Sequence, residues 1–409
     1  METWEKNLYV IAFAEMIGIT GMAFLIPFLP FYVKELGIVK TEEVAYWSSW
    51  LISVPSLAMV IVSPFWGILA DCFGRKPMVE RAMFGGAITI FLMAWATDVY
   101  QLLALRILQG TLTGTIAACT ALVSSSSPSR KMGFSLGLLQ TGIFLGNFLG
   151  PLLGGISADT LGFRNSFRIT ALLLFIAGCL IFFLVKENFT PSDKNEKKVP
   201  LKKKLALLLN NRQLLVVFFI LFLVQFSVKI VSPVFPLFME TIVANPKTVS
   251  TFTGLMFAIT GLMSAFSALN IGKFVGKKPS DSLLTISLIG TGAFFLPHAF
   301  VSNTTQLIFL RIGLGLFYGT IVPIANTIIG LSTPPQHRGK IFGISNSITF
   351  SGNILGPISG GLIMVSFGLS AVFVFTGVLL LLTGSTLPFI LKRPVTDKIS
   401  EKAEFYKAK

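Results

Sequence analysis

The sequence predicts an all-α membrane protein with twelve transmembrane helices in two pseudo-symmetric six-helix bundles. Three observations lead to this fold class. Of the 409 residues, 53% are hydrophobic and only 12% are charged, whereas soluble domains average about 25% charged residues. The apolar residues gather into runs of about 20, the length of a membrane-spanning helix. The two halves of the chain also share motifs at a nearly constant separation.

Glycine, proline and charged residues separate the apolar runs and mark where each helix is expected to end. The longest polar stretch, 186–212, divides the runs into two sets of six. It predicts an N-terminal bundle over 1–186, a basic cytoplasmic linker over 187–212, a C-terminal bundle over 213–391 and a cytoplasmic tail over 392–409. The expected helices lie near 8–33, 45–70, 78–97, 101–124, 134–157, 167–185, 213–239, 250–271, 282–301, 306–330, 341–366 and 371–391.

Basic residues set the expected orientation. Most of the 33 Lys and Arg residues fall in or beside segments on one side of the predicted topology, and by the positive-inside rule this is the cytoplasmic side. Both termini are therefore expected in the cytoplasm. The same asymmetry explains the net charge of +15, so the basic linker is expected to face anionic lipid and no nucleic-acid partner is expected.

An internal repeat relates the two halves. The stretch "QLLALRILQGTLTGTI" at 101–116 matches "QLIFLRIGLGLFYGTI" at 306–321, and "GNFLGPLLGG" at 146–155 matches "GNILGPISGG" at 352–361. Prolines 27 and 30 of the first helix match prolines 233 and 236 of the seventh. Matched helices have the same expected orientation, which is a parallel repeat about an axis along the membrane normal. Transporters of this design carry substrate between the halves, near the midplane.

Three motifs occupy corresponding places in this topology. The loop between the second and third helices reads "GILADCFGRKPMV", the fourth helix carries Arg106, and the fifth carries a glycine–proline run. Together they resemble the major facilitator superfamily, and more narrowly the twelve-span drug:proton antiporters of bacteria. The resemblance covers the chain from residue 8 to about 391. It implies a secondary transporter, and the glycine–proline run implies efflux rather than uptake.

The loop motif has a physical basis. Gly67 and Gly74 permit a tight turn and a close approach of helices, and Arg75 and Lys76 anchor the loop on the cytoplasmic side. Asp71 is placed to accept hydrogen bonds from a helix N-terminus, where a carboxylate is favoured. The resemblance implies that this terminus belongs to the second half and that the contact latches an outward-facing state. The alternative is an ordinary positive-inside turn.

The glycine–proline run places small residues on one helix face. A spacing of four residues puts the glycines above one another, which lets two backbones approach closely, and the proline removes one helical hydrogen bond. We expect a hinge or seal between the halves, with direct gating as the alternative. The residues concerned are Gly146, Gly150, Pro151 and Gly154, together with Gly356 and Pro357 in the repeat.

Four charged residues lie well inside the expected helices, away from their ends: Glu15, Arg106, Lys229 and Arg311. Such residues normally face the bundle interior and mark function. At about 1.5 Å of rise per residue, Glu15 lies roughly 10 Å from the level of the three cations along the membrane normal. A direct ion pair is therefore not expected in straight helices.

Glu15 is the only acid well inside a helix. Burial favours its neutral form, so a carboxyl reachable from either side in turn can carry a proton. The resemblance adds that a first-helix carboxylate twelve residues before Pro27 helps to recognise cationic substrates. A structural carboxyl bonded to a neighbouring helix is the alternative.

Each of the three buried basic residues has two possible roles. Arg106 and Arg311 are repeat mates, and they either tune proton transfer at a carboxyl, as the resemblance implies, or satisfy backbone carbonyls of neighbouring helices. Lys229 has no basic mate in the first half, and it is either neutral or positioned to receive an anion. Gln225 and Asn147 are further candidates for the lining of a cavity.

The function predicted from these residues is secondary active export of amphipathic, drug-like compounds in exchange for protons by alternating access. The expected partners are a small-molecule substrate, protons and the lipid bilayer, with the proton gradient as energy source. We expect a monomer in the cell membrane, with no cofactor, no metal and no enzymatic activity, since no nucleophile set, metal cluster or phosphate loop is apparent.

Two alternatives remain at this point. The cations Arg106, Lys229 and Arg311 would also suit an exporter of one endogenous metabolite, such as an organic anion or a siderophore-like molecule. A transport-inactive membrane scaffold or sensor is disfavoured by the charges that both halves bury.

Overall fold

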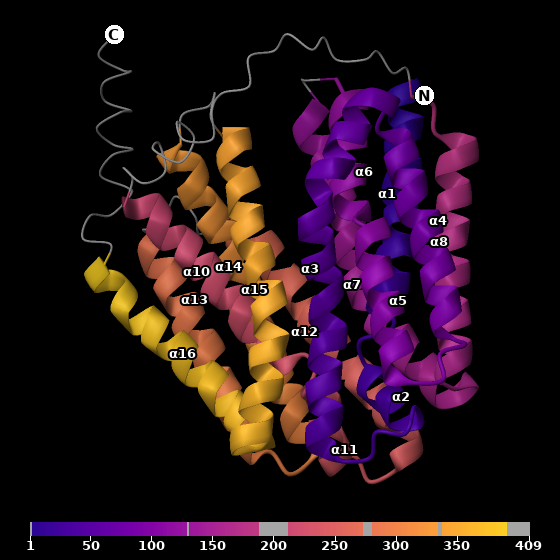
Figure 1. Ribbon diagram of the computed structural model, residues 1–409. Helices are drawn as coiled ribbons and strands as arrows, with labels where there is room; N and C mark the ends of the chain where they lie inside the picture. Colours follow the sequence, from indigo (N-terminus) through magenta and orange to yellow (C-terminus); the bar gives the residue numbers. More distant parts are fainter. Residues whose placement is uncertain (1, 129–130, 188–211, 273–279, 334–337, 391–409) are drawn as a thin grey trace, which may run out of the picture. The chain divides into compact units, whose positions relative to one another are not determined.

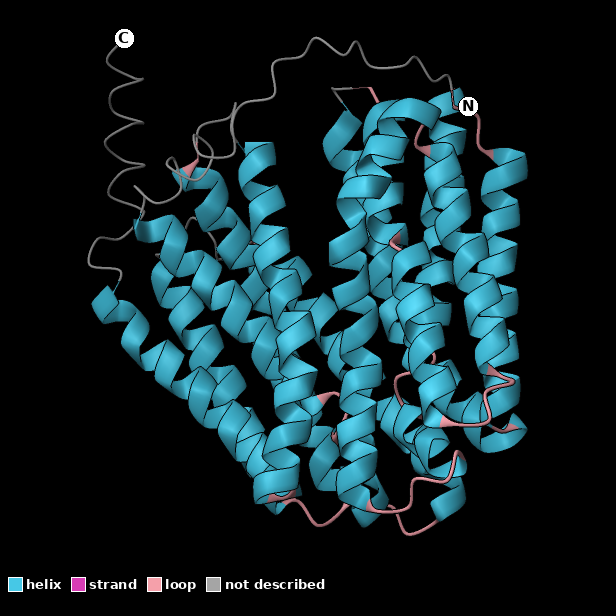
Figure 2. Ribbon diagram, in the orientation of Figure 1, coloured by secondary structure: helices cyan, strands magenta, loops and turns pink. Residues whose placement is uncertain are grey.

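The protein is described by a computed structural model that covers residues 2–128, 131–187, 212–272, 280–333 and 338–390. Throughout these residues the regular structure is helical (Figure 2). The elements are α1 (Thr3–Ala23), α2 (Leu29–Glu35), α3 (Thr41–Phe73), α4 (Lys76–Met93), α5 (Val99–Leu112), α6 (Thr115–Ser126), α7 (Met132–Leu161), α8 (Phe163–Leu184), α10 (Arg212–Val231), α11 (Phe235–Ile242), α12 (Val249–Ile271), α13 (Ser280–Phe295), α14 (Thr304–Ser332), α15 (Arg338–Phe367) and α16 (Leu369–Ile390), with short 3₁₀ turns at Pro246–Thr248 and Leu296–Phe300.

The predicted all-α membrane fold is confirmed. Within the described residues, ten helical segments are long and apolar enough to cross a membrane. The first and third expected helices fall outside this set for separate reasons. The first is α1, which has 21 residues but carries Glu5, Lys6 and Glu15, and it stops at Ala23, where a turn precedes α2. The third is α4, which is only 18 residues long and begins with the charged residues Lys76, Glu80 and Arg81.

The repeat extends to the breaks in the helices. Where one helix was expected over 8–33, α1 is followed by a turn and then by α2, which has a proline in its first turn. Where one was expected over 213–239, α10 ends at Val231 and α11 begins at Phe235, again with a proline next in the chain. A proline fits the first turn of a helix, where its missing N–H would be unbonded anyway. The matched prolines therefore restart the helix at the same place in both halves.

One break has no counterpart in the repeat. The fourth expected helix is divided into α5 and α6 at Gly114, whose φ of +111° and ψ of 38° belong to the left-handed region that favours glycine. Gly114 matches Gly319 of the second half, which lies inside the continuous helix α14. The same motif thus has two different backbone conformations in one chain.

The described helices fall into two compact units. The first contains Met1–Glu196 and Phe235–Ala258, and the second contains Lys197–Val234 and Ile259–Lys409. The segment with α11 and the first turns of α12 thus belongs with the first unit. In the first unit α1 packs against α6, α7 and α8, and in the second unit α10 packs against α15 and α16 (Figure 1). The division of the chain into bundles at 187–212 stays a prediction.

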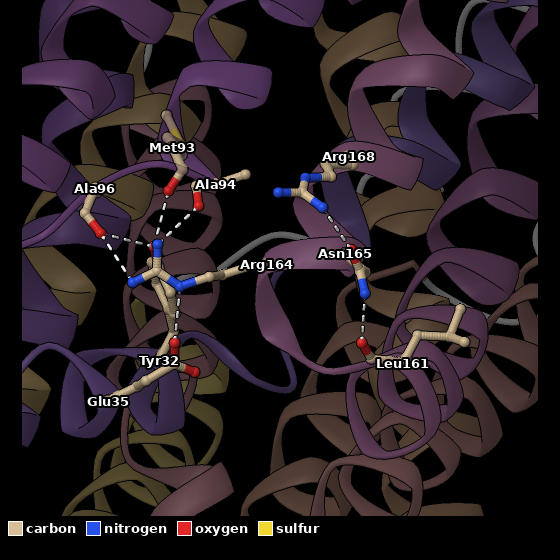
Figure 3. Close-up of polar contacts among 9 residues, drawn as sticks. All are labelled: Tyr32, Glu35, Met93, Ala94, Ala96, Leu161, Arg164, Asn165 and Arg168. Carbon is tan, nitrogen blue, oxygen red and sulfur yellow. Dashed lines mark hydrogen bonds and ion pairs between the residues drawn. The ribbon is translucent and has the colours of Figure 1, made fainter.

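Arg164 connects three elements at one end of the first unit (Figure 3). From the first turn of α8 it donates to the carbonyl of Ala94, just past the end of α4, at 3.0 Å, and to Glu35 Oε1 at 3.0 Å. Beside it the Tyr32 hydroxyl donates to the carbonyl of Met93 at 2.8 Å. These donors satisfy carbonyls that the end of α4 leaves without helical partners, so they fix α4, α8 and the short helix α2 together.

Candidate functional site

The carboxyl of Glu15 is fully buried in the first unit, and its hydrogen bonds come from α6. Thr115 Oγ1 donates to Oε1 at 3.0 Å and Cys119 Sγ donates to Oε2 at 3.2 Å. Thr115 is the first residue of α6 and Cys119 lies about one turn later, so both donors are on the same side of that helix. Among the described residues Glu15 forms no ion pair, in agreement with the expectation from helix depths.

Apolar side chains surround this carboxyl. Its neighbours in the chain, Ala14 and Ile11, and its donor Cys119 belong to one buried cluster with Met83 of α4 and Ile143 of α7. Water is therefore kept away from Glu15 in this state, and the two donors from α6 are the described hydrogen bonds of its side chain. This geometry agrees with a structural carboxyl that is bonded to a neighbouring helix. It agrees equally with a buried carboxyl that binds and releases a proton.

Arg106 is buried in α5 of the same unit, but it has a different partner. Its Nη1 donates to Gln109 Oε1 at 2.9 Å, three residues later in the same helix. Both side chains are buried. The bond to Gln109 is to a side chain, so neither interpretation of Arg106 is decided by it, and its role in proton transfer stays a prediction.

The other two cations belong to the second unit. Lys229 lies near the end of α10, half-buried, and among the described residues no carboxylate pairs with it. One turn earlier, Gln225 Oε1 accepts from the Tyr318 hydroxyl of α14 at 3.4 Å. Arg311 is buried in α14. Gln225 and Lys229 thus share the side of α10 that α14 and α15 approach.

Asn147 makes a local bond. Its Nδ2 donates to the carbonyl of Ile143 at 3.0 Å, one turn back in α7. The Asn147 residue as a whole is exposed. A cavity-lining role for Asn147 remains a prediction.

The loop motif is held by a residue that sequence analysis did not identify. Gly74 ends α3 with a φ of +97°, as expected for a tight turn. The backbone N–H groups of Arg75 and Lys76 then donate to the two carboxylate oxygens of Glu187 at 2.9 and 2.8 Å. A carboxylate thus does cap a helix N-terminus at this loop: Glu187, which follows α8, caps the N-terminus of α4.

The two remaining loop residues differ from this tight arrangement. Asp71 is exposed, and among the described residues it has no hydrogen bond or ion pair, so its latch role stays a prediction. Gly67 lies inside α3 with open space around it. The close helix approach expected at Gly67 is therefore not present in the described structure.

The glycine faces pack inside their own units. A methyl group on Gly146 or Gly150 would collide with the backbone of α1, and one on Gly154 would collide with Phe24, the residue after α1. A methyl group on Gly356 would collide with α10. The expected close approach is present: these glycines lie against α1 or α10 of their own half. Pro151 of the same run lies against Gly254 of α12, which belongs to the second half of the sequence. Pro151 and Pro357 lie inside α7 and α15. A gating role for these residues is still a prediction.

A second carboxylate-capped helix lies elsewhere in the first unit. Asp159, in the last turn of α7, accepts from the backbone N–H groups of Ser250 and Thr251 at 3.3 and 2.6 Å. Nearby, Lys34 of α2 and Glu240 of α11 form an ion pair at 2.6 Å. These acids lie at helix ends, so a search for charges inside apolar runs passes over them. Thr115 and Cys119 were missed because ordinary hydroxyls and thiols carry no sequence signal for a partner a hundred residues away.

Comparison with known proteins agrees with this architecture. The sequence profile of the Major Facilitator Superfamily matches residues 11–280 and 217–407. Multidrug resistance protein MdtG of Proteus mirabilis is 35% identical over 375 residues, which cover 91% of this chain and 93% of that protein. Multidrug resistance protein MdtG of Salmonella schwarzengrund is 36% identical over 377 residues, which cover 91% of this chain and 92% of that protein.

Solved structures share the fold at low sequence identity. A bacterial homologue of the human lysosomal transporter Spinster, in an inward-facing and occupied conformation, has a TM-score of 0.81 at 11% identity, covering 97% of this chain and 99% of that chain. A variant of the nucleoside transporter NupG has a TM-score of 0.79 at 15% identity, covering 94% and 99%. These two likenesses concern the fold alone.

Proposed function

The chain belongs to the Major Facilitator Superfamily, and we propose that it exports amphipathic, drug-like compounds in exchange for protons by alternating access. Its relatives in Proteus and Salmonella are named multidrug resistance proteins, which supports efflux of more than one compound. Membership of a transporter family agrees with the predicted transport function and leaves no reason to expect an enzyme.

One observation carries the proton part of this proposal. Glu15 is fully buried among apolar residues and bonded by two donors from α6. A carboxylate at such a site is costly unless it is compensated, so uptake of a proton changes its energy strongly. A group of this kind can exchange its proton only when a conformational change opens a path to water, and this requirement couples proton movement to the alternation of access.

The chain is a multi-pass membrane protein. We infer its finer placement from the basic residues: the cell membrane, with both termini in the cytoplasm. The energy source in this proposal is the proton gradient, the substrate is a small molecule, and the working unit is a monomer. Glu15, Arg106, Lys229, Arg311, Gln225 and Asn147 are the residues that we assign to substrate or proton handling.

The proposal is tested with Glu15→Gln in proteoliposomes. Glutamine keeps nearly the same shape but cannot release a proton. Uptake of one cationic and one neutral substrate is measured with and without an imposed pH gradient. If Glu15 carries the proton, gradient-driven transport of both substrates collapses while substrate-for-substrate exchange survives. If Glu15 instead recognises the substrate charge, only transport of the cation is lost.

A matched control is the exposed acid Glu43, which lies in the first turn of α3 and pairs with Lys40 at 3.4 Å. Glu43→Gln removes a carboxylate outside the apolar interior and should leave all four measurements unchanged. Wild-type transport by Glu15→Gln in all four conditions would contradict both roles of Glu15 and leave the carboxyl as a structural bond between α1 and α6.

Lys229 favours a second candidate function. Its side chain is half-buried in the apolar helix α10, and the described residues supply no carboxylate to pair with it. A buried cation without an internal partner can receive the charge of an anion. We therefore keep export of an endogenous organic anion as the alternative, to be distinguished by substrate charge.

A further inference from the structure

The break in the fourth membrane segment is stabilised at both of its ends. On the α5 side, Trp66 Nε1 donates to the carbonyl of Thr111 at 2.7 Å, and Arg81 Nη2 donates to the carbonyl of Thr113 at 3.4 Å. The Arg81 guanidinium also lies over the Trp66 ring, 3.7 Å from its centroid. The end of a helix exposes carbonyls with partial negative charge, so these donors and this cation stabilise an end created inside the membrane.

The α6 side of the break faces an acid instead. The residue before α6 is Gly114, which has no side chain to cap the new N-terminus. Glu15 lies against that first turn and accepts from Thr115 and from Cys119. Negative charge is favoured at a helix N-terminus. The break therefore places a cation at one new helix end and a carboxyl at the other.

The second half provides an internal comparison. The repeat matches Glu15 with Leu221, Thr115 with Thr320, and Cys119 with Ile324. There the helix is continuous, and the Thr320 hydroxyl bonds Ser287 at 2.7 Å. The half that has no buried acid at this position has no break either. The broken helix thus occurs together with the carboxyl, and the shared motif does not account for it.

We propose that Thr115 and Cys119 are positioning residues that hold the ionised form of Glu15 against the N-terminus of α6, and so set the pH at which Glu15 exchanges its proton. This inference rests on the proposed function for its role in transport. When the Glu15 carboxyl loses its proton to water, the O–H of Thr115 and the S–H of Cys119 donate to the oxygens that then carry the charge. A movement of α6 away from α1 removes these bonds and favours proton uptake.

Other charged groups near α1 have partners elsewhere. The helices packed against α1 are α6, α7 and α8, and Met83 of α4 joins the same buried cluster. The cation of α4 at the break, Arg81, donates to the Thr113 carbonyl and lies over the Trp66 ring. On α6 the titratable group is Cys119 itself. The remaining titratable residues of α7 and α8 are Asp159, Arg164, Arg168 and Cys179. The first three bond Thr251, Ala94 and Asn165 at the far end of the unit, and no described bond joins Cys179 to Glu15.

The test measures the protonation of Glu15 directly. Infrared difference spectra of the purified full chain in lipid are recorded against pH, and the protonated carboxyl band is identified by its loss in Glu15→Gln. Thr115→Val keeps the shape and removes the donor. We expect the pH at which the band has half its full intensity, its pH midpoint, to rise by about one unit in Thr115→Val. The reason is that one hydrogen bond to the ionised carboxylate stabilises it by about the free energy of one pH unit. Cys119→Ala should move the midpoint less, because a thiol is a weak donor.

Conservative variants separate this role from packing. Thr115→Ser restores the hydroxyl and should restore the midpoint. Cys119→Ser replaces a weak donor by a strong one and should move the midpoint down. The controls are Thr120→Val, whose hydroxyl bonds its own helix α6 at Ile116, and the repeat mate Thr320→Val. Neither control variant should change the pH midpoint of the carboxyl band.

The outcomes are distinct. An unchanged midpoint in Thr115→Val and in Cys119→Ser would overturn the inference, as would equal shifts in the two controls. The failure of the proposed function looks different: Glu15→Gln would retain gradient-driven transport even though the carboxyl band responds to Thr115 and Cys119. If the proposed function and this inference are both correct, the pH midpoint of transport shifts by the same amount as the pH midpoint of the carboxyl band in every variant.

Discussion

The carboxylate of Asp159 lies against the first turn of α12 and accepts from the Thr251 N–H at 2.6 Å. The neighbouring N–H of Ser250 reaches the other carboxylate oxygen at 3.3 Å. The two helices are also in backbone contact here, since a methyl group on Gly155 of α7 would collide with the carbonyl of Ser250. The end of α7 is therefore joined to the start of α12 by charge and by close packing.

We expect Asp159→Ala to loosen this junction. The variant leaves two N–H groups of α12 without a side-chain acceptor, and loss of a helix cap costs about 1 kcal/mol. Hydrogen exchange followed by mass spectrometry should show faster exchange at the first turn of α12. The first turn of α14, capped by Asn303 through the Gln306 N–H, is the internal control. Equal protection of α12 in the variant and the wild type would contradict the role of Asp159.

The glycine face of α7 gives a second prediction. A methyl group on Gly154 would overlap the backbone carbonyl of Phe24, whereas Gly137 of the same helix has open space. Overpacking costs about 1–3 kcal/mol. We therefore expect Gly154→Ala to lower the thermal unfolding midpoint in detergent, and Gly137→Ala to leave it unchanged. Similar midpoints for the two variants would show that α7 and α1 can separate without cost.

Sequence analysis anticipated the features that depend on composition and periodicity. Runs of apolar residues predicted the helices, and the matched prolines Pro27 and Pro233 predicted the repeat, although one continuous helix was expected at each of the two places where the structure has a break. It did not anticipate that Gly114 and Gly319, in nearly the same motif, have different backbones. A glycine permits the left-handed conformation without requiring it. The choice depends on neighbours far away in the chain.

The same limit applies to the candidate site. Glu15 could be identified because a carboxylate in an apolar helix is costly. Its donors could not, since the partners of a buried carboxyl depend on how helices pack. The capping acids Asp159 and Glu187 lie at helix ends, where a charge needs no explanation. Their roles depend on which N-terminus each one meets, and this is a property of the fold.

Trp66 gives a prediction about the broken segment. Its indole N–H satisfies the carbonyl of Thr111 at the end of α5. Trp66→Phe keeps an aromatic ring beside Arg81 but leaves that half-buried carbonyl without its donor, and loss of such a hydrogen bond costs about 1 kcal/mol. We expect a lower unfolding midpoint. Trp95→Phe, at an exposed position, is the control, and a matching loss in both variants would point to ring size rather than to the bond.

Lys229 gives the prediction that separates the two candidate functions. Its side chain is half-buried in an apolar helix, and one turn away Gln225 bonds Tyr318. If Lys229 receives an anionic substrate group, Lys229→Ala should weaken binding of anionic compounds to the purified protein and spare cationic ones. The control is Gln225→Ala, which alters the same side of α10 without removing a charge and should affect both classes alike.

Equal losses of anionic and cationic binding in Lys229→Ala would assign Lys229 to the packing of α10 against α15, since Gly356 of α15 lies against the Lys229 Cβ. Selective loss of anions would instead make an organic anion the substrate class to pursue.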